Sequence, residues 1–219
     1  ASRKDAPFSV EFYGEDRPME KVESVLFDVG NVLIRFDPDY ILENLFEDAA
    51  VRKGVKRTLF LDPLWLALDR GTEQPGHVAQ VLGERYPDLA WAYEKLMEEW
   101  IDFAPAMDES VKRLERLKGE GYRLYVLSNF ARQAFYSVAG RNPFFKLFDG
   151  IMISAEQHLL KPDLEIFRRA AKDFHLTPSR TLFIDDSAGN VEAAGFLGFQ
   201  TLLFRKAEQI DQVLPAKNA

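Results

Sequence analysis

The chain of 219 residues contains no cysteine. It therefore has no disulfide framework, no thiolate metal site and no cysteine nucleophile, and the absence fits a reducing compartment. No apolar run approaches the roughly 20 residues that a membrane-spanning helix needs, and the N-terminus lacks the short apolar stretch of a secretory signal. We accordingly expect a soluble, unexported protein of the cytoplasm with no membrane partner.

Positive charge is also in short supply, with 28 Lys and Arg residues against 35 Asp and Glu residues and a net charge of −7. There is no long Lys/Arg block, which argues against electrostatically driven binding to nucleic acid or to an acidic membrane. An anionic small substrate stays open, because a few local cations suffice to bind one. The chain also lacks internal repeats and low-complexity tracts, and its length suits one large domain with or without a smaller insert.

What is present is an alternation of short apolar runs with helical patterns. The expected strands are residues 24–29, 122–127, 149–154, 180–185 and 199–204. The expected helices between them are residues 110–118, 131–138, 163–174 and 188–197. Strands alternating with helices of this length indicate βαβ units. The prediction is an α/β fold with a Rossmann-like, three-layer core whose parallel sheet is covered on both faces.

One segment breaks this rhythm, because residues 38–103 are helix-like throughout, with prolines as the breaks and no strand-like run. We expect an inserted helical cap domain here, and a core formed by residues 21–37 and 104–219. The alternative is that these helices pack on the sheet as part of one layer. Residues 1–20 are expected to be an extension, and the alternation over residues 8–13 suits either an added edge strand or a leader.

Polar residues follow the expected strands at the positions where ligands bind in an open parallel sheet. The first strand, in "VLFDVGNVLI", ends at Asp28, and the second delivers Ser128 and Asn129. Lys161 stands before Pro162, which is expected to be the first residue of a helix. The fourth strand ends in the pair Asp185 and Asp186. Carboxylates, a hydroxyl and one ammonium, without cysteine or a suitably placed histidine, indicate metal-assisted transfer to or from an anionic group.

The order D-x-G-N-V, L-S-N, K-P and D-D-x-x-x-N at these strand ends resembles the haloacid dehalogenase superfamily, on the branch of phosphatases with a helical cap after the first motif. The resemblance covers residues 23–204. No single motif is specific, but four in order, each behind its own apolar strand, are strong evidence. Each residue taken alone could also have a purely structural role. Asp28 could cap the next turn, Ser128 could be a turn residue, and Lys161 could be a solvated surface cation.

The resemblance implies a role for each residue. Asp28 would attack phosphorus and form an aspartyl-phosphate. Asp28, Asp186, Asp185 and the backbone carbonyl of Gly30 would hold Mg²⁺. The phosphate-binding residues would be Ser128, Asn129, Gly30, Asn31, Lys161 and the cap residue Arg70. Lys161 and Ser128 would also take part in catalysis, and Asn190 would orient Asp185 or Lys161.

The residue at position 30 departs from the pattern, because phosphatases of this superfamily usually carry a second Asp there as proton carrier. Gly30 keeps a backbone carbonyl and loses the acid. Either another acid substitutes, or the substrate has an easy leaving group, or the protein is a slow or inactive binder. The candidate substitutes are Asp37, Asp39, Asp69, Glu73 and His77.

We therefore expect a Mg²⁺-dependent phosphatase that hydrolyses a small phosphorylated metabolite, most plausibly a sugar phosphate, as a monomer or weak homodimer. The alternative chemistry is that of a metal-independent 2-haloacid dehalogenase, since these enzymes also lack the second Asp. The pair Asp185 and Asp186 argues against it, because adjacent carboxylates repel unless a cation lies between them or one is well solvated.

Overall fold

The computed structural model describes residues 21–216, which form a five-stranded parallel sheet in the order β3-β2-β1-β4-β5. The strands are β1 (Ser24–Phe27), β2 (Arg123–Ser128), β3 (Gly150–Ile153), β4 (Thr181–Asp185) and β5 (Gln200–Leu203). The expected α/β fold with a parallel sheet is confirmed. The predicted extension over residues 1–20, with its possible strand at 8–13, lies outside the described residues.

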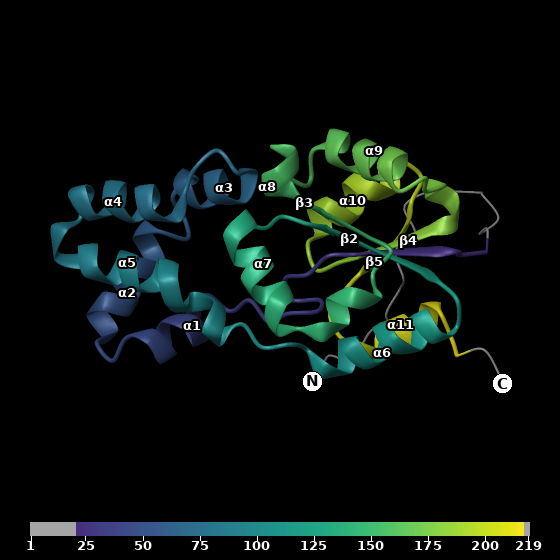
Figure 1. Ribbon diagram of the computed structural model, residues 1–219, viewed down its shortest axis with the longest axis horizontal. Helices are drawn as coiled ribbons and strands as arrows, with labels where there is room; N and C mark the ends of the chain where they lie inside the picture. Colours follow the sequence, from purple (N-terminus) through teal and green to yellow (C-terminus); the bar gives the residue numbers. More distant parts are fainter. Residues whose placement is uncertain (1–20, 217–219) are drawn as a thin grey trace, which may run out of the picture.

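Side chains alternate between the two faces of the central strand, as the period of two in a strand requires. Val25 and Phe27 belong to one apolar cluster, and Leu26 between them belongs to another. The helices of the core are α6 (Asp108–Gly119), α7 (Arg132–Arg141), α8 (Ser154–Gln157), α9 (Leu164–Asp173), α10 (Ala188–Phe196) and α11 (Glu208–Val213). Side chains of α6, α7 and α11 belong to the first cluster, and side chains of α9 and α10 belong to the second. Helices therefore cover both faces of the sheet (Figure 1).

A helical insertion separates β1 from β2. It contains α1 (Pro38–Leu45), α2 (Ala49–Thr58), α3 (Pro63–Arg70), α4 (Pro75–Arg85), η1 (Pro87–Leu89), α5 (Ala90–Glu99) and η2 (Trp100–Phe103). These helices pack on one another to one side of the sheet (Figure 1), which rules out the alternative of one layer on the sheet. Three of the α-helices and the 3₁₀ helix η1 begin with proline, whose missing N–H costs nothing in a first turn. The division into a cap domain at 38–103 stays a prediction.

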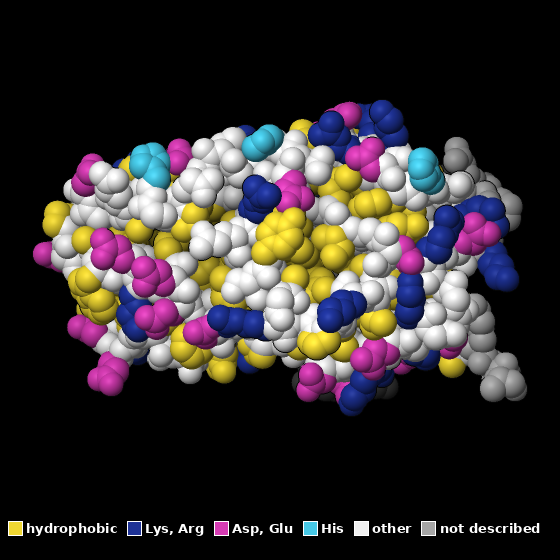
Figure 2. Space-filling model, viewed as in Figure 1, with side chains coloured by type: hydrophobic (Ala, Val, Ile, Leu, Met, Phe, Trp, Pro, Cys, Tyr) yellow, Lys and Arg dark blue, Asp and Glu magenta, His cyan; other side chains and the backbone are white. Residues whose placement is uncertain are grey.

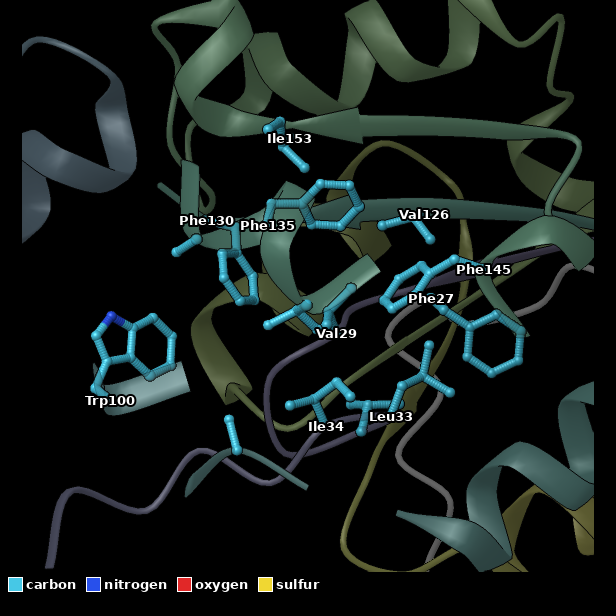
Figure 3. Close-up of a cluster of buried hydrophobic side chains, with 14 of the residues drawn as sticks. Phe27, Val29, Leu33, Ile34, Trp100, Val126, Phe130, Phe135, Phe145 and Ile153 are labelled. Carbon is cyan, nitrogen blue, oxygen red and sulfur yellow. The ribbon is translucent and has the colours of Figure 1, made fainter. Parts of the chain in front are cut away.

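The insertion shares one continuous apolar cluster with a face of the sheet. Figure 3 draws part of this cluster, in which Phe27, Val29 and Val126 from the sheet region join Phe130 of the loop after β2 and Phe135 of α7. Its cap members include Tyr93, Leu96 and Trp100. Because burial of apolar area is the main favourable term in folding, this shared cluster holds the cap against the core.

Several helical segments differ from the sequence prediction. Pro162 does not begin a helix: α9 starts at Leu164, because the Asp163 side chain accepts a hydrogen bond from the Glu165 N–H and caps the helix there. The short helices α8 and α11 were not predicted, since four and six residues are too few for a periodic pattern. The expected strands lie within two residues of the observed ones.

Candidate active site

The carboxyl ends of β1, β2 and β4 bring Asp28, Ser128 and Asp185 to one edge of the sheet. Phe27 of the central strand is in register with Val126 on one side and Ile184 on the other. The next residue, Asp28, donates its N–H to the Ile184 carbonyl at 2.9 Å. The register therefore places these strand ends side by side, as the sequence predicted.

Lys161 holds the strand ends together from a fully buried position. Its Nζ lies 2.8 Å from Asp28 Oδ1 and 2.7 Å from Asp185 Oδ2, and it donates to the Leu127 carbonyl at 2.8 Å. An ammonium has three donors, so all are engaged. Burial alone would lower the pKa of Lys161, but the charges of Asp28 and Asp185 outweigh it and raise that pKa above its ordinary value.

The backbone of Lys161 is also held. The Asn129 side chain donates to the Lys161 carbonyl at 2.9 Å and accepts from the Lys161 N–H at 2.8 Å. This double contact explains what Asn129 does in the fold: it positions the cation between the two carboxylates. The phosphate contact that the sequence predicts for Asn129 stays a prediction.

Asp185 is fully buried and receives a complete set of donors besides Lys161. The Asn190 amide donates to both carboxylate oxygens at 3.0 Å, and the Ser187 N–H donates at 2.8 Å. The predicted contact of Asn190 with Asp185 is confirmed. Together with Lys161, these donors hold the Asp185 carboxyl group in one orientation at the base of the site.

Asp186 and Asn31 lie beside this centre. The Asn31 amide donates to Asp186 Oδ2 at 3.3 Å, and the Asn31 Oδ1 accepts from the Phe36 N–H at 2.9 Å. Burial, and next the charge of Asp185, raise the pKa of Asp186 above its ordinary value. Both contacts stabilise the turn that carries Gly30 and Asn31 away from β1.

Asp28 is buried and accepts a hydrogen bond from the Ser128 hydroxyl. Its pKa is raised to about 6, chiefly by burial and also by the Asp185 charge, although Lys161 opposes both. Three carboxylates thus face one ammonium, and the surplus negative charge calls for a cation.

Three carboxylates that could hold a cation meet at this point. Asp28, Asp185 and Asp186 each offer one carboxylate oxygen, and the three oxygens lie within 4.8 Å of one another. An all-oxygen, carboxylate donor set suits Mg²⁺, which accepts one or two carboxylates and keeps several waters. The residues present therefore fit the expected metal.

Asp69 is distinguished from the other acids that were candidates for the missing proton carrier. Burial raises the pKa of Asp69 to about 7, with a further rise from the Asp28 charge and an opposing hydrogen bond from the Ala131 N–H. Asp69 lines the same cavity as Gly30 and Asn129. It enters from the last turn of α3, so the cap supplies a carboxyl next to the strand ends.

The other four candidates for the proton carrier are paired with neighbouring side chains. Asp37 caps α1 and pairs with Arg35, and Asp39 pairs with Lys56 at 2.6 Å. Glu73 and His77 pair with each other at 2.6 Å. These partners hold the groups in place for structural reasons and leave Asp69 as the acid facing the site.

Arg70, the predicted cap contact to substrate, has an exposed side chain and lies outside the set of residues that line the main cavity. Its carbonyl is 3.1 Å from His158 Nδ1 on the core. The substrate-binding role of Arg70 stays a prediction.

Sequence reasoning missed Ser154, whose buried hydroxyl donates to the Asp69 carbonyl and accepts from the Phe130 N–H at 2.9 Å. It joins the cap helix that carries Asp69 to the loop after β2. The sequence did contain a signal for Ser154, because it directly follows β3. Polar residues at the carboxyl ends of parallel strands are the ones expected at a ligand site, and Asp28 and Ser128 were identified in this way.

A cavity of about 590 Å³ lies between cap and core beside this centre. It is lined by residues of the loops after β1 and β2, of the cap elements α3, α4, α5 and η2, and of α7. In Figure 2, hydrophobic side chains are visible between α4 and α5 and onward to α7. Within residues 21–216, none of the helices has the length and hydrophobicity of a membrane span.

The chain is similar in sequence to known proteins. A family model described as haloacid dehalogenase-like hydrolase matches residues 22–198. A sesquiterpene phosphatase, astK, of Aspergillus oryzae is 26% identical over 80% of this chain and 86% of its own length. A D-ribitol-5-phosphate phosphatase of Bacteroides thetaiotaomicron is 26% identical over 82% of this chain and 90% of its own length.

One relative is much longer than this chain: the drimenol cyclase drtB of Aspergillus calidoustus is 24% identical over 88% of this chain but only 36% of its own length. Among solved structures, a HAD family enzyme of Bacteroides thetaiotaomicron in complex with magnesium and inorganic phosphate superposes with a TM-score of 0.69. It is 25% identical and covers 83% of this chain and 93% of its own.

Proposed function

Because the chain belongs to the haloacid dehalogenase-like hydrolases, we propose that it is a Mg²⁺-dependent phosphatase acting on a small phosphorylated substrate through an aspartyl-phosphate. The observation that carries the proposal is the buried centre in which Lys161 joins Asp28 and Asp185 beside Asp186. The phosphatases among the relatives, and the magnesium and phosphate in the solved neighbour, support the same chemistry.

Asp28 is the proposed nucleophile. Its carboxylate oxygen attacks phosphorus while the ester P–O bond breaks, and Lys161 and the Ser128 hydroxyl hold Asp28 in the orientation for attack. Asp28, Asp186, Asp185 and the Gly30 carbonyl would hold Mg²⁺, which would supply positive charge to a phosphoryl group in this site. Water then attacks phosphorus and releases phosphate from Asp28. Fixed charges of this kind act most strongly in a site shielded from water.

Asp69 is the proposed proton carrier in place of the absent second Asp. The leaving oxygen takes its proton from the Asp69 carboxyl, and the resulting carboxylate later accepts a proton from the attacking water. Its position in the cavity beside Gly30 supports this role, and a pKa of about 7 keeps a useful fraction of both forms at neutral pH.

The relatives leave the leaving group open, since one acts on a polyol phosphate and another on a sesquiterpene phosphate. A sugar phosphate, as the sequence predicted, and the phosphate of an apolar alcohol are therefore both candidates.

The test is hydrolysis of p-nitrophenyl phosphate by wild type and Asp28→Asn, each with Mg²⁺ and with chelator. The aryl ester leaves easily, so the assay tests nucleophile and metal without the acid. We expect Mg²⁺-dependent release that falls roughly a thousandfold or more in Asp28→Asn. Asp88→Asn, an exposed acid on the cap, is the matched control and should keep full activity.

A pure wild-type protein that releases no phosphate from this ester with Mg²⁺ contradicts the proposal. Halide release from a 2-haloacid in chelator would then identify the dehalogenase chemistry. Phosphate-analogue binding with neither activity would identify a slow or inactive binder.

A further inference from the structure

The wall of the cavity beside the proposed nucleophile is aromatic. Phe36 and Trp65 stack with their ring centres 5.9 Å apart, and Trp100 meets Phe36 edge-on at 5.6 Å. Trp100 also stacks on Phe130 at 6.1 Å, and both are labelled in Figure 3. Phe36 and Phe130 lie in the loops after β1 and β2, and the two tryptophans belong to the cap. The aromatic wall is therefore complete only when the cap packs against the core.

Aliphatic side chains extend this apolar wall, and Ile34 and Leu68 are among them. A pocket of about 590 Å³ falls in the size range of small-molecule sites. Gly30, Asp69 and Asn129 are among its lining residues, and Gly30 and Asn129 directly follow the strand ends that carry Asp28 and Ser128. A phosphoryl group bound at Asp28 therefore directs the rest of its molecule into an apolar space.

Polar groups in this cavity are few. They are Asp69, Asn129 and Ser137, which are half-buried, and Glu94, Glu98 and Gln133, which are exposed at the rim. The Asn129 amide is engaged with the Lys161 backbone. A sugar or polyol hydroxyl group that lies against the aromatic and aliphatic wall would have no partner there, and each such group costs free energy when it is taken from water.

The charges around the cavity are all of one sign. Among the described residues that line it, the ionisable side chains are Asp69, Glu94 and Glu98, with no Lys, Arg or His. A second phosphate or a nucleotide phosphate chain would meet only like charge in this space. The cavity therefore suits a monophosphate with an uncharged leaving group.

We propose that the substrate is the monophosphate of an apolar alcohol, whose hydrocarbon part fills the cavity walled by Phe36, Trp65, Trp100 and Phe130. The proposal rests on the phosphatase function above and narrows it to a substrate class. Burial of hydrocarbon against these rings supplies the binding free energy, and the proton from Asp69 meets the need of an alkoxide leaving group.

The first measurement is kcat/KM with Mg²⁺ for n-alkyl phosphates from ethyl to decyl, below their micellar concentrations. D-ribitol 5-phosphate, a hexose 1-phosphate and p-nitrophenyl phosphate are assayed beside them. Binding of the matching n-alkylphosphonates is measured by calorimetry, because these cannot be hydrolysed. We expect affinity to rise roughly three- to fourfold per added methylene until the cavity is filled.

The second measurement uses tryptophan variants. Trp65→Ala should lower the ratio of decyl to ethyl kcat/KM roughly tenfold or more, because it removes a wall of the cavity. Trp91→Ala is the matched control, since Trp91 is a cap tryptophan that is 52% exposed and outside the lining. Gly76→Phe is a second variant: a Cβ at this lining residue meets no atom within 4 Å, so it narrows the cavity without removing packing.

The outcomes separate the two proposals. Hydrolysis of p-nitrophenyl phosphate together with a flat alkyl series, or a higher kcat/KM for the polyol phosphate than for decyl phosphate, overturns the substrate class alone. Absence of p-nitrophenyl phosphate hydrolysis overturns the phosphatase and the substrate inference with it. A rising series that Trp65→Ala and Gly76→Phe flatten, and Trp91→Ala leaves unchanged, supports both.

Discussion

At the scale of single residues, we expect the carboxyl of Asp69 to set the fall of alkyl phosphate hydrolysis at high pH. Its pKa of about 7 means that the acid form is present below pH 7 and is lost as the pH rises through that value. Hydrolysis of an alkyl phosphate should therefore fall above pH 7, and Asp69→Asn should lower it by roughly 10²- to 10⁴-fold and remove that limb of the profile. Hydrolysis of p-nitrophenyl phosphate should change much less. Equal losses on both esters would contradict the role.

The raised pKa of Asp69 should also change how the stability of the fold depends on pH. A carboxyl whose pKa is raised on folding favours the folded state least at high pH, because the native state must then hold a desolvated charge. The contribution is lost as pH rises from the ordinary value of 3.8 through about 7. Asp69→Asn should consequently raise the melting temperature at pH 8 and leave it nearly unchanged at pH 4. An unchanged melting temperature at both pH values would show that the carboxyl is solvated.

Gly30 offers a direct test of what the missing acid costs. A Cβ built at Gly30 meets no atom within 4 Å, so a side chain fits there. In an Asp69→Asn background, Gly30→Asp should restore alkyl phosphate hydrolysis roughly tenfold or more, because it returns a proton carrier two residues after Asp28. Gly30→Asn is the matched control and should restore nothing. Equal rescue by both variants would point to a steric effect.

At the scale of elements, the junction of α3 with α8 decides where the cap places Asp69 and Trp65. Gly71 ends α3 in a left-handed conformation, with φ of 74°, and a Cβ there would lie 2.2 Å from the Ala155 carbonyl oxygen. Any side chain at position 71 must therefore push α3 away from the core. The Ser154 hydroxyl fixes the same junction.

Gly71→Ala should destabilise the protein by about 2 kcal/mol, which for a chain of this size lowers the melting temperature by roughly 4–8 °C. Because α3 carries Asp69, alkyl phosphate hydrolysis should fall more than aryl phosphate hydrolysis. Gly76→Ala is the control, as its Cβ meets open space and alanine favours a helix. A melting temperature equal to that of the control would contradict the tight junction.

At the scale of the whole molecule, metal binding should couple to folding. The carboxylates that could hold the ion come from β1 and from the end of β4, so the cation site exists only when the sheet is assembled. Mg²⁺ at about one hundred times its Kd should stabilise the fold by ~2.7 kcal/mol. Scanning calorimetry with and without Mg²⁺ measures this, and Asp186→Asn should abolish the shift while Asp88→Asn keeps it. A shift that survives Asp186→Asn would place the ion elsewhere.

The parallel sheet and the strand ends that carry Asp28, Ser128, Asp185 and Asp186 followed from the amino-acid sequence alone. They did so because apolar strands alternate with helices locally, and because parallel strands present their carboxyl ends at one edge. The short helices α8 and α11 gave no such local signal.

Tertiary structure alone decided how the cap completes the site. It engages the Asn129 amide with the Lys161 backbone and joins Trp65 and Trp100 to Phe36 and Phe130. Of the five candidate acids, it places Asp69 in the wall of the main cavity. These contacts link segments far apart along the chain, and the pKa of Asp69 depends on desolvation by the cap against the core. No pattern of sequence spacing encodes such contacts, because they arise only when separate elements pack together.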